Sequence, residues 1–219
     1  MSEHERVSPS EAEYDILEIR NLLGKDLPTR EFLASYKPDT AWFMEEAGGI
    51  HGVGHEARVL VLQELLAILV ERQDGIQLDH EALRVAAITH DVRRINHKLD
   101  FAHGERAAHW IGRQQELKER ISPSSMLLAQ YINHWHVPND TYIPNIPPEL
   151  SILKDADGLD RVRLGDVDPS FFRHDFSKNL LLRPAALLFE ATSQSATIPA
   201  EQQFDFVLDT AANLGMIRP

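Results

Sequence analysis

The sequence predicts an all-α protein that folds as a single-domain helical bundle. Apolar residues recur at spacings of three and four along most of the chain, which is typical of amphipathic helices. No run of four or more residues alternates apolar and polar positions with the β-branched enrichment of strands. Helix-breaking pairs such as Asp74-Gly75 and Ser122-Pro123 separate the periodic segments. We therefore expect helices joined by turns, and no sheet.

Several of the expected helices have recognisable ends. Asp79 is an N-cap candidate, Ser122-Pro123 places proline in a first turn, and Gly215 is a C-cap candidate behind the last helix. In chain order the expected helices are Ser10–Leu23, Thr29–Ser35, Val53–Arg72, Asp79–Arg94, Gly104–Glu119, Pro123–Trp135, Pro148–Leu164, Leu180–Thr192 and Ala200–Leu214. No internal repeat or low-complexity linker interrupts them. We assign residues 1–45 to an N-terminal helical extension, 46–165 to the core, and 166–219 to C-terminal helices packed on that core.

Composition excludes several classes of protein. The 219 residues are 43% hydrophobic and 26% charged, which excludes disordered and collagen-like chains. The longest apolar stretch, 59–70, contains Gln63 and Glu64 and is too short to span a bilayer. The N-terminus lacks the apolar segment of a secretory signal. We therefore expect a cytoplasmic protein with no membrane partner.

Charge and cysteine content narrow the partners and the chemistry. The net charge is −12, from 34 acidic and 22 basic residues, so bulk nucleic acid is disfavoured as a partner. A small anionic ligand in a locally basic pocket remains compatible with that charge. The absence of cysteine excludes disulfides, zinc–thiolate sites, iron–sulfur clusters and a cysteine nucleophile. A homo-oligomer is left open.

Histidine is the unusual component of this sequence. Nine of the 11 histidines lie between His51 and His136, on different expected helices. Ligands from several helices can meet in the core of a bundle. Imidazole and carboxylate donors suit Mn, Fe, Co, Ni, Zn or Mg, so we expect one or two divalent ions per chain. The pair His90-Asp91 continues an apolar helix face, and a carboxylate there can bridge two ions.

Five short motifs follow one another along residues 49–164. They are His55-x-x-Arg58-Val59, His90-Asp91, His103-Gly104, His134 with His136, and Ala156-Asp157-x-Leu159-Asp160. In this order they resemble the HD-domain superfamily of metal-dependent phosphohydrolases. The resemblance covers roughly half of the chain, and the doublet is specific only together with its flanking motifs. It implies an HD-type helical core around a metal centre, which makes 46–165 the expected metal-binding region.

The resemblance also implies the core ligands. His55, His90, Asp91 and Asp157 match the four core metal ligands of the family. Asp155 is the alternative to Asp157, which fits better because it directly follows alanine.

Further histidines match positions that hold a second metal or contact phosphate in bimetallic members. We assign His103 and His134 to the metal, and His136 to the substrate. His51, four residues before His55, is expected one turn away at the helix N-terminus as a substrate contact. Arg94, in the basic stretch that follows the doublet, is expected to bind an anionic substrate.

The expected activity is hydrolysis of a small phosphorylated substrate, a nucleotide or another phosphate ester. A metal-activated water would attack phosphorus, with Asp91 orienting that water or accepting its proton. His103 would hold the second metal or the phosphate oxygens, and Arg94 would offset the developing negative charge. Two alternatives stay open: an HD-type di-iron oxygenase, and a non-catalytic metal- or ligand-binding regulatory protein.

Overall fold

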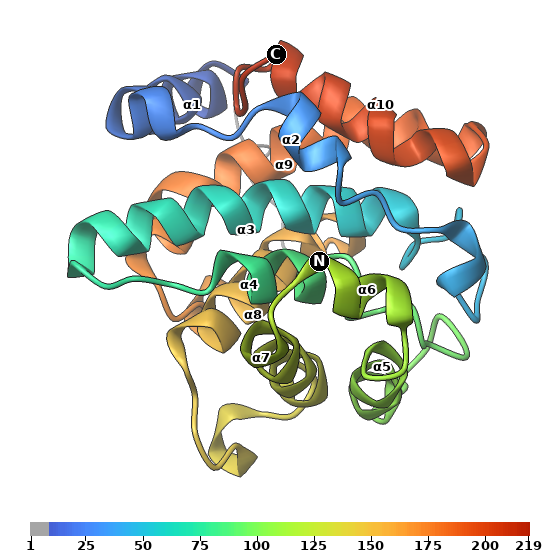
Figure 1. Cartoon of the computed structure of the whole chain (residues 1–219). Coiled ribbons are helices and arrows are strands. Elements are labelled where there is room, and N and C mark those ends of the chain that lie inside the picture. Colours follow the sequence, from blue (N-terminus) through green and yellow to red (C-terminus); the bar gives the residue numbers. More distant parts are fainter. Residues whose placement is uncertain (1–8) are drawn as a thin grey trace.

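Helix α3 (Val53–Asp74) is the central element of the fold. The structure, a computed structural model, describes residues 9–219. Figure 1 shows α3 running between two groups of helices, one on each side. Its residues from Val53 to Ala67 are buried without exception, because α3 is covered from both sides. A chemically active side chain on α3 therefore points into protein, whichever way it faces.

The group that positions the candidate site lies on one side of α3 (Figure 1). Its helices are α4 (His80–Ala87), α5 (His103–Ile111), α6 (Gln115–Arg120), α7 (Pro123–Trp135) and α8 (Pro148–Asp160). Asp79 and Ser122 cap α4 and α7, where their side chains accept from Ala82 N and Ser125 N. The Asp79 cap was expected from the sequence, as was a proline in the first turn of α7.

The other group combines the two ends of the chain. It contains α1 (Pro9–Leu23), α2 (Arg30–Ala34), α9 (Leu182–Thr192) and α10 (Ala200–Asn213). A single isolated bridge joins Thr29 to Arg218, and residues 9–219 otherwise contain helices and turns only. The all-α prediction is confirmed. Residues 1–8 of the predicted N-terminal extension lie outside the described part.

The helix expected over Asp79–Arg94 is shorter than predicted. Helix α4 ends at Ala87, and the His90-Asp91 doublet lies in the irregular turn that follows. Thr89 Oγ1 donates to Val85 O at 2.6 Å, and the Asp91 backbone N–H donates to Glu56 Oε1 at 3.3 Å. Side chains thus replace the backbone hydrogen bonds of a further turn. The apolar residues of 88–92 are buried there without being helical.

Two other expected helices are interrupted. The helix expected over Gly104–Glu119 is two helices, α5 and α6, with a break after Ile111. A Cβ on Gly112 would lie 2.0 Å from the amide nitrogen of Gln130, whose side chain donates to Ala108 O across this break. The helix expected over Pro148–Leu164 ends at Asp160 and continues as a 3₁₀ turn, Arg161–Leu164. Within residues 9–219, no helix combines the length and the apolar character needed to cross a membrane.

Candidate metal centre

Four buried histidines from four different elements meet beside α3. His55 lies in the first turn of α3, His90 in the turn after α4, His103 at the start of α5, and His136 directly after α7. Together with the predicted aspartates they form three overlapping groups that can hold a metal ion. The groups are His51 with His55 and Asp91, His55 with His90 and Asp157, and Asp91 with His103 and His136.

The first half of the centre consists of His55, His90 and Asp157. The Nε2 atoms of the two imidazoles are 3.1 Å apart. Asp157 Oδ1 lies 3.5 Å from His55 Nε2 and 3.9 Å from His90 Nε2. Both imidazoles are fully enclosed, whereas the Asp157 side chain is 32% exposed. The centre therefore opens to solvent on the Asp157 side.

The second half consists of Asp91, His103 and His136. The two imidazoles again face each other through Nε2, at 2.9 Å. Asp91 Oδ1 lies 2.9 Å from His103 Nε2 and 3.9 Å from His136 Nε2. This approach depends on Gly104, because a Cβ there would lie 2.4 Å from Asn133 O and 3.1 Å from the His136 ring. The sequence pair His103-Gly104 therefore has a steric reason: glycine lets α5 contact the end of α7.

Asp91 connects the two halves. Its Oδ1 faces the second half, while its Oδ2 lies 3.6 Å from His55 Nε2 in the first half. Oδ2 also lies 2.8 Å from His51 Nδ1. A carboxylate with one oxygen toward each half is placed as a bridging ligand of a two-ion site.

The other ring nitrogen of each buried imidazole is already used. Nδ1 contacts Asp160 Oδ2 at 2.7 Å in His55 and Ala87 O at 3.0 Å in His90. In the second half, His136 Nδ1 contacts Asn133 O at 2.7 Å, and His103 Nδ1 contacts Asp100 O. A backbone carbonyl only accepts hydrogen bonds, and so does an ionised carboxylate. Each Nδ1 is therefore the donor, and each Nε2 of a neutral ring carries a lone pair.

This assignment of the protons tests whether the residues fit a metal. In neutral rings, two lone pairs would face each other at 3.1 Å in one half and at 2.9 Å in the other. Such contacts are repulsive unless a metal ion lies between the nitrogens or a proton on one ring turns the contact into a hydrogen bond. Two nitrogens bound at about 2.1 Å to one ion, at a right angle, are about 3.0 Å apart. The donor set and its spacing therefore fit a metal ion in each half.

Burial and neighbouring charges set the protonation of the donors. Burial is the main reason why the pKa of His136 falls to about 4 and that of His55 to about 3. Burial alone would raise the pKa of Asp91, but the positive charge on His90, followed by the contacts of the carboxylate with the rings of His103, His136 and His51, holds that pKa well below its usual value. At neutral pH, Asp91 is thus ionised, and the imidazoles of His55 and His136 are neutral, as metal ligands must be.

Three charged residues support this centre without having been assigned to it from the sequence. Asp160 accepts from His55 Nδ1 and also from Arg58, whose Nε and Nη2 lie at 2.6 and 3.0 Å. Arg163 Nη1 lies 3.3 Å from Asp160 Oδ2, and Glu56 Oε2 lies 2.9 Å from His90 Nδ1. Asp160 had a signal in the sequence, because it lies three residues after Asp157 on the same helix.

His134 is the predicted ligand that the structure does not bring to the centre. Its ring packs against the Trp135 ring, with centroids 4.6 Å apart, outside all three groups of potential ligands among residues 9–219. His136 occupies the place beside His103 instead. The chain leaves the helix after Trp135, and Asn133 O, three residues earlier, holds the His136 ring inward. The geometry thus reverses the expected roles: His136 is the candidate ligand and His134 is not.

Geometry also separates Asp157 from its alternative, Asp155. Asp155 is buried and accepts hydrogen bonds from the backbone N–H groups of Arg173 and His174 and from the Ser177 hydroxyl. Its carboxylate therefore anchors the segment after α8 and faces away from the imidazoles. Only Asp157 takes part in a group that can hold a metal.

Two of the three predicted substrate contacts, His51 and Arg94, lie at the edge of the centre. His51 precedes α3, whose N-cap is Gly52, and its side chain is 11% exposed beside Asp91. Arg94 Nη1 lies 3.5 Å from Asp91 Oδ1, and its Nη2 donates to Lys98 O at 2.7 Å. Arg163 joins them, with its Nη2 at 3.2 Å from His51 Nδ1. All three are cationic or cation-forming groups beside a carboxylate-rich site.

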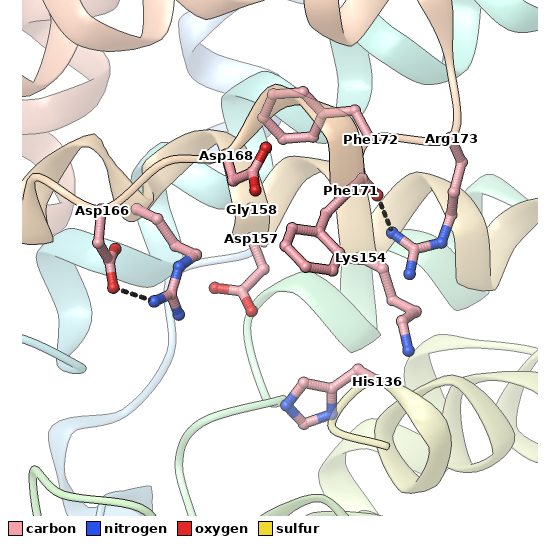
Figure 2. Close-up of a pocket in the computed structure, with 10 residues that line it drawn as sticks. His136, Lys154, Asp157, Gly158, Asp166, Asp168, Phe171, Phe172 and Arg173 are labelled. Atoms are coloured by element: carbon pink, nitrogen blue, oxygen red, sulfur yellow. Dashed lines mark hydrogen bonds and ion pairs between the residues drawn. The ribbon is translucent and has the colours of Figure 1, made fainter. Parts of the chain in front are cut away.

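A cavity of about 300 Å³ lies over the open side of the centre. Figure 2 shows Asp157 and His136 facing it from different helices, with Lys154 and Phe171 beside them. Lys154 is tethered to Asp140 at 3.0 Å, and the Phe171 side chain is largely exposed. The cavity thus combines a metal-facing carboxylate with a cation and an apolar ring.

No family model matches this chain, and neither the curated proteins nor the solved structures contain a match to it. The assignment of a metal centre is based on the geometry of the buried side chains.

Proposed function

We propose that this protein is a metal-dependent phosphohydrolase that acts on a nucleotide or another small phosphate ester. The observation that carries the proposal is the pair of facing Nε2 contacts, His55 with His90 and His103 with His136, joined by the two oxygens of Asp91. A bridged two-ion site suits phosphate ester chemistry, because both the attacking and the leaving oxygen can be stabilised. The resemblance of the motif order to the HD-domain superfamily supports the same activity.

The residues have distinct roles in this proposal. His55, His90 and Asp157 would hold one ion, His103 and His136 would hold the other, and Asp91 would contribute one carboxylate oxygen to each half. The chemistry that divalent ions supply at such a site is acidification of water and polarisation of a phosphoryl oxygen. Water then adds to phosphorus, the ester P–O bond breaks, and the alcohol leaves with a proton.

Neighbouring side chains bind and orient the substrate. Arg94 and Arg163 flank Asp91 and His51, where they can balance the charge of the phosphoryl oxygens. Asp91 keeps its negative charge at neutral pH, since its pKa lies well below the usual value. It therefore orients water as an acceptor and does not itself take up the proton.

Elemental analysis and a substrate panel test the proposal together. Protein purified without added metal is expected to contain a first-row divalent metal. When loaded with Mn, Mg, Co or Ni, it is expected to release phosphate or an alcohol product from a member of a phosphomonoester and nucleotide panel. Asp91→Asn is the matched inactive variant. Metal-loaded protein that is inert across the whole panel contradicts the proposal.

One feature favours a second candidate, a di-iron oxygenase. Four of the six donors are imidazoles, and a carboxylate joins the two halves, a set that also suits iron. Iron in the protein as isolated, with a visible absorption band and consumption of oxygen, would favour this second function over hydrolysis.

A further inference from the structure

A second hollow differs from the metal centre in its lining. Cationic side chains line it, and no carboxylate does. Its volume is about 410 Å³, and it lies between α5 and the segments before α3 and after α4. The residues that line it are Met44, Arg93, Arg106, His109, Trp110 and Arg113. None of them belongs to the three groups of potential metal ligands.

The lack of a carboxylate is unusual in this chain, which has 34 acidic and 22 basic residues. Most arginines of the described residues form an ion pair, as Arg30 does with Asp205 and Arg183 with Asp15. Within residues 9–219, neither Arg93 nor Arg113 has a carboxylate partner. Both of these unpaired arginines line the same hollow.

The Arg93 side chain is held in place by an aromatic ring, and its Nε has no hydrogen-bond acceptor within residues 9–219. Its guanidinium lies 4.4 Å from the centroid of the Trp110 ring, a cation–π contact that orients it. Its Nε is buried and has no hydrogen-bond partner within residues 9–219. Arg106 cannot supply one, because a guanidinium only donates hydrogen bonds. Its Nε and Nη2 donate to Arg93 O at 3.0 and 2.9 Å, and it also forms an ion pair with Asp100.

We propose that this hollow is a binding site for a small phosphorylated molecule, separate from the metal centre. Arg93 and Arg113 are placed to bind the phosphate oxygens, and arginine is well suited to that purpose. Met44 and Trp110 offer an apolar surface to the remainder of the ligand. An oxyanion here supplies the counter-charge that the half-buried Arg93 guanidinium lacks within residues 9–219.

Calorimetric titration with inorganic pyrophosphate tests the proposal on the full-length protein. Arg93→Gln and Arg113→Gln are each expected to weaken binding by about tenfold or more, the loss of one charged hydrogen-bonding group. Arg120→Gln is the matched control. Arg120 also stacks on an aromatic ring, at 5.2 Å from the Tyr36 centroid, but lies outside the hollow. It is expected to change the affinity less than twofold.

Repetition of the titration on Asp91→Asn separates this site from the metal centre. Pyrophosphate binding that persists in Asp91→Asn and is lost in Arg113→Gln supports the proposal, whatever the fate of the proposed hydrolase activity. If all three arginine variants bind pyrophosphate equally weakly, the affinity reflects the overall charge of the protein. If Asp91→Asn abolishes binding, pyrophosphate binds only at the metal centre. Either result overturns the proposal. Arg113→Gln is included because Arg113 has no partner whose loss would disturb folding.

Discussion

The two halves of the metal centre are built from the same donors but are supported differently. In the first half, charged side chains contact the Nδ1 atoms: Asp160, paired with Arg58, contacts His55, and Glu56 contacts His90. In the second half, backbone carbonyls accept from Nδ1, Asp100 O for His103 and Asn133 O for His136, and the Arg94 Nη1 atom lies 3.4 Å from His103 Nδ1.

This difference has consequences for metal affinity. A carboxylate behind an imidazole raises the basicity of the ring and fixes its orientation, whereas a carbonyl mainly fixes the orientation. We therefore expect the first half to hold its ion more tightly and the second half to exchange more readily.

The largest effect is expected from Asp91→Asn, which removes the carboxylate shared by both halves. The amide keeps the size of the side chain but removes the negative charge and one acceptor oxygen. Metal content should fall in both halves together. A metal contributes several kcal/mol to the transition state, and about 1.4 kcal/mol is tenfold in rate, so activity should fall by about a thousandfold. Elemental analysis and phosphate release measure the two effects.

Asp168→Asn is the control for this variant. Asp168 lies at the edge of the cavity and accepts from Ser170 N at 2.9 Å, without facing an imidazole. The metal content of Asp168→Asn should equal that of the unaltered protein. Retention of one ion in Asp91→Asn would show that the halves are independent and that Asp91 is not a bridge.

A smaller effect, confined to one half, is expected from His136→Ala. This variant should lose the ion of the second half and keep that of the first, because His55, His90 and Asp157 are untouched. His134→Ala is the matched comparison and should keep both ions, since His134 packs on Trp135 outside the centre. The metal-to-protein ratio after dialysis distinguishes them. Loss of metal in His134→Ala, with none in His136→Ala, would restore the assignment made from the sequence.

The contrast between His134 and His136 shows what the sequence could not predict. Both histidines follow the same helical pattern, and the family resemblance does not choose between them. The choice depends on where α7 ends, at Trp135, and on the contact of Asn133 O with the His136 ring. Helix ends are decided by a few local hydrogen bonds, which periodicity does not report.

The helices themselves were largely predictable from spacing, because a 3.6-residue period is a strong signal over several turns. The breaks between helices could not be predicted from this spacing. The turn that holds His90 and Asp91 depends on Glu56, distant in sequence, and the break after Ile111 depends on Gln130 of a neighbouring helix. Asp160 was visible in the motif but had no role assigned to it, since its contact with His55 spans more than a hundred residues.

A graded effect is expected from Asp160→Asn, which keeps all six donors but removes the charge behind His55. The affinity of the first half for metal should fall by about 10- to 100-fold, as for other groups that support a ligand. Asp155→Asn is the comparison from the same helix. Asp155 anchors Arg173, His174 and Ser177, so its loss should lower the unfolding temperature with little change in metal affinity. Competition with a chelator measures the metal affinity, and thermal unfolding measures the stability. Equal metal affinities in Asp160→Asn and Asp155→Asn would contradict the difference between the halves.

The smallest effect is a difference in proton release when metal binds. Burial lowers the pKa of His90, but the Glu56 and Asp91 carboxylates outweigh it and hold the pKa well above its usual value. In the metal-free protein at pH 7, His90 therefore carries a proton at Nε2, and an ion in the first half must displace it. The second half releases none from His136, whose pKa of about 4 leaves it neutral.

The affinity of the first half should thus rise with pH up to the His90 pKa, while that of the second half changes little near neutrality. Calorimetry in two buffers with different ionisation enthalpies should show more protons released per ion for His136→Ala, which binds only in the first half, than for the unaltered protein. Equal release per ion in both would mean that the two halves do not differ in charge before metal binds.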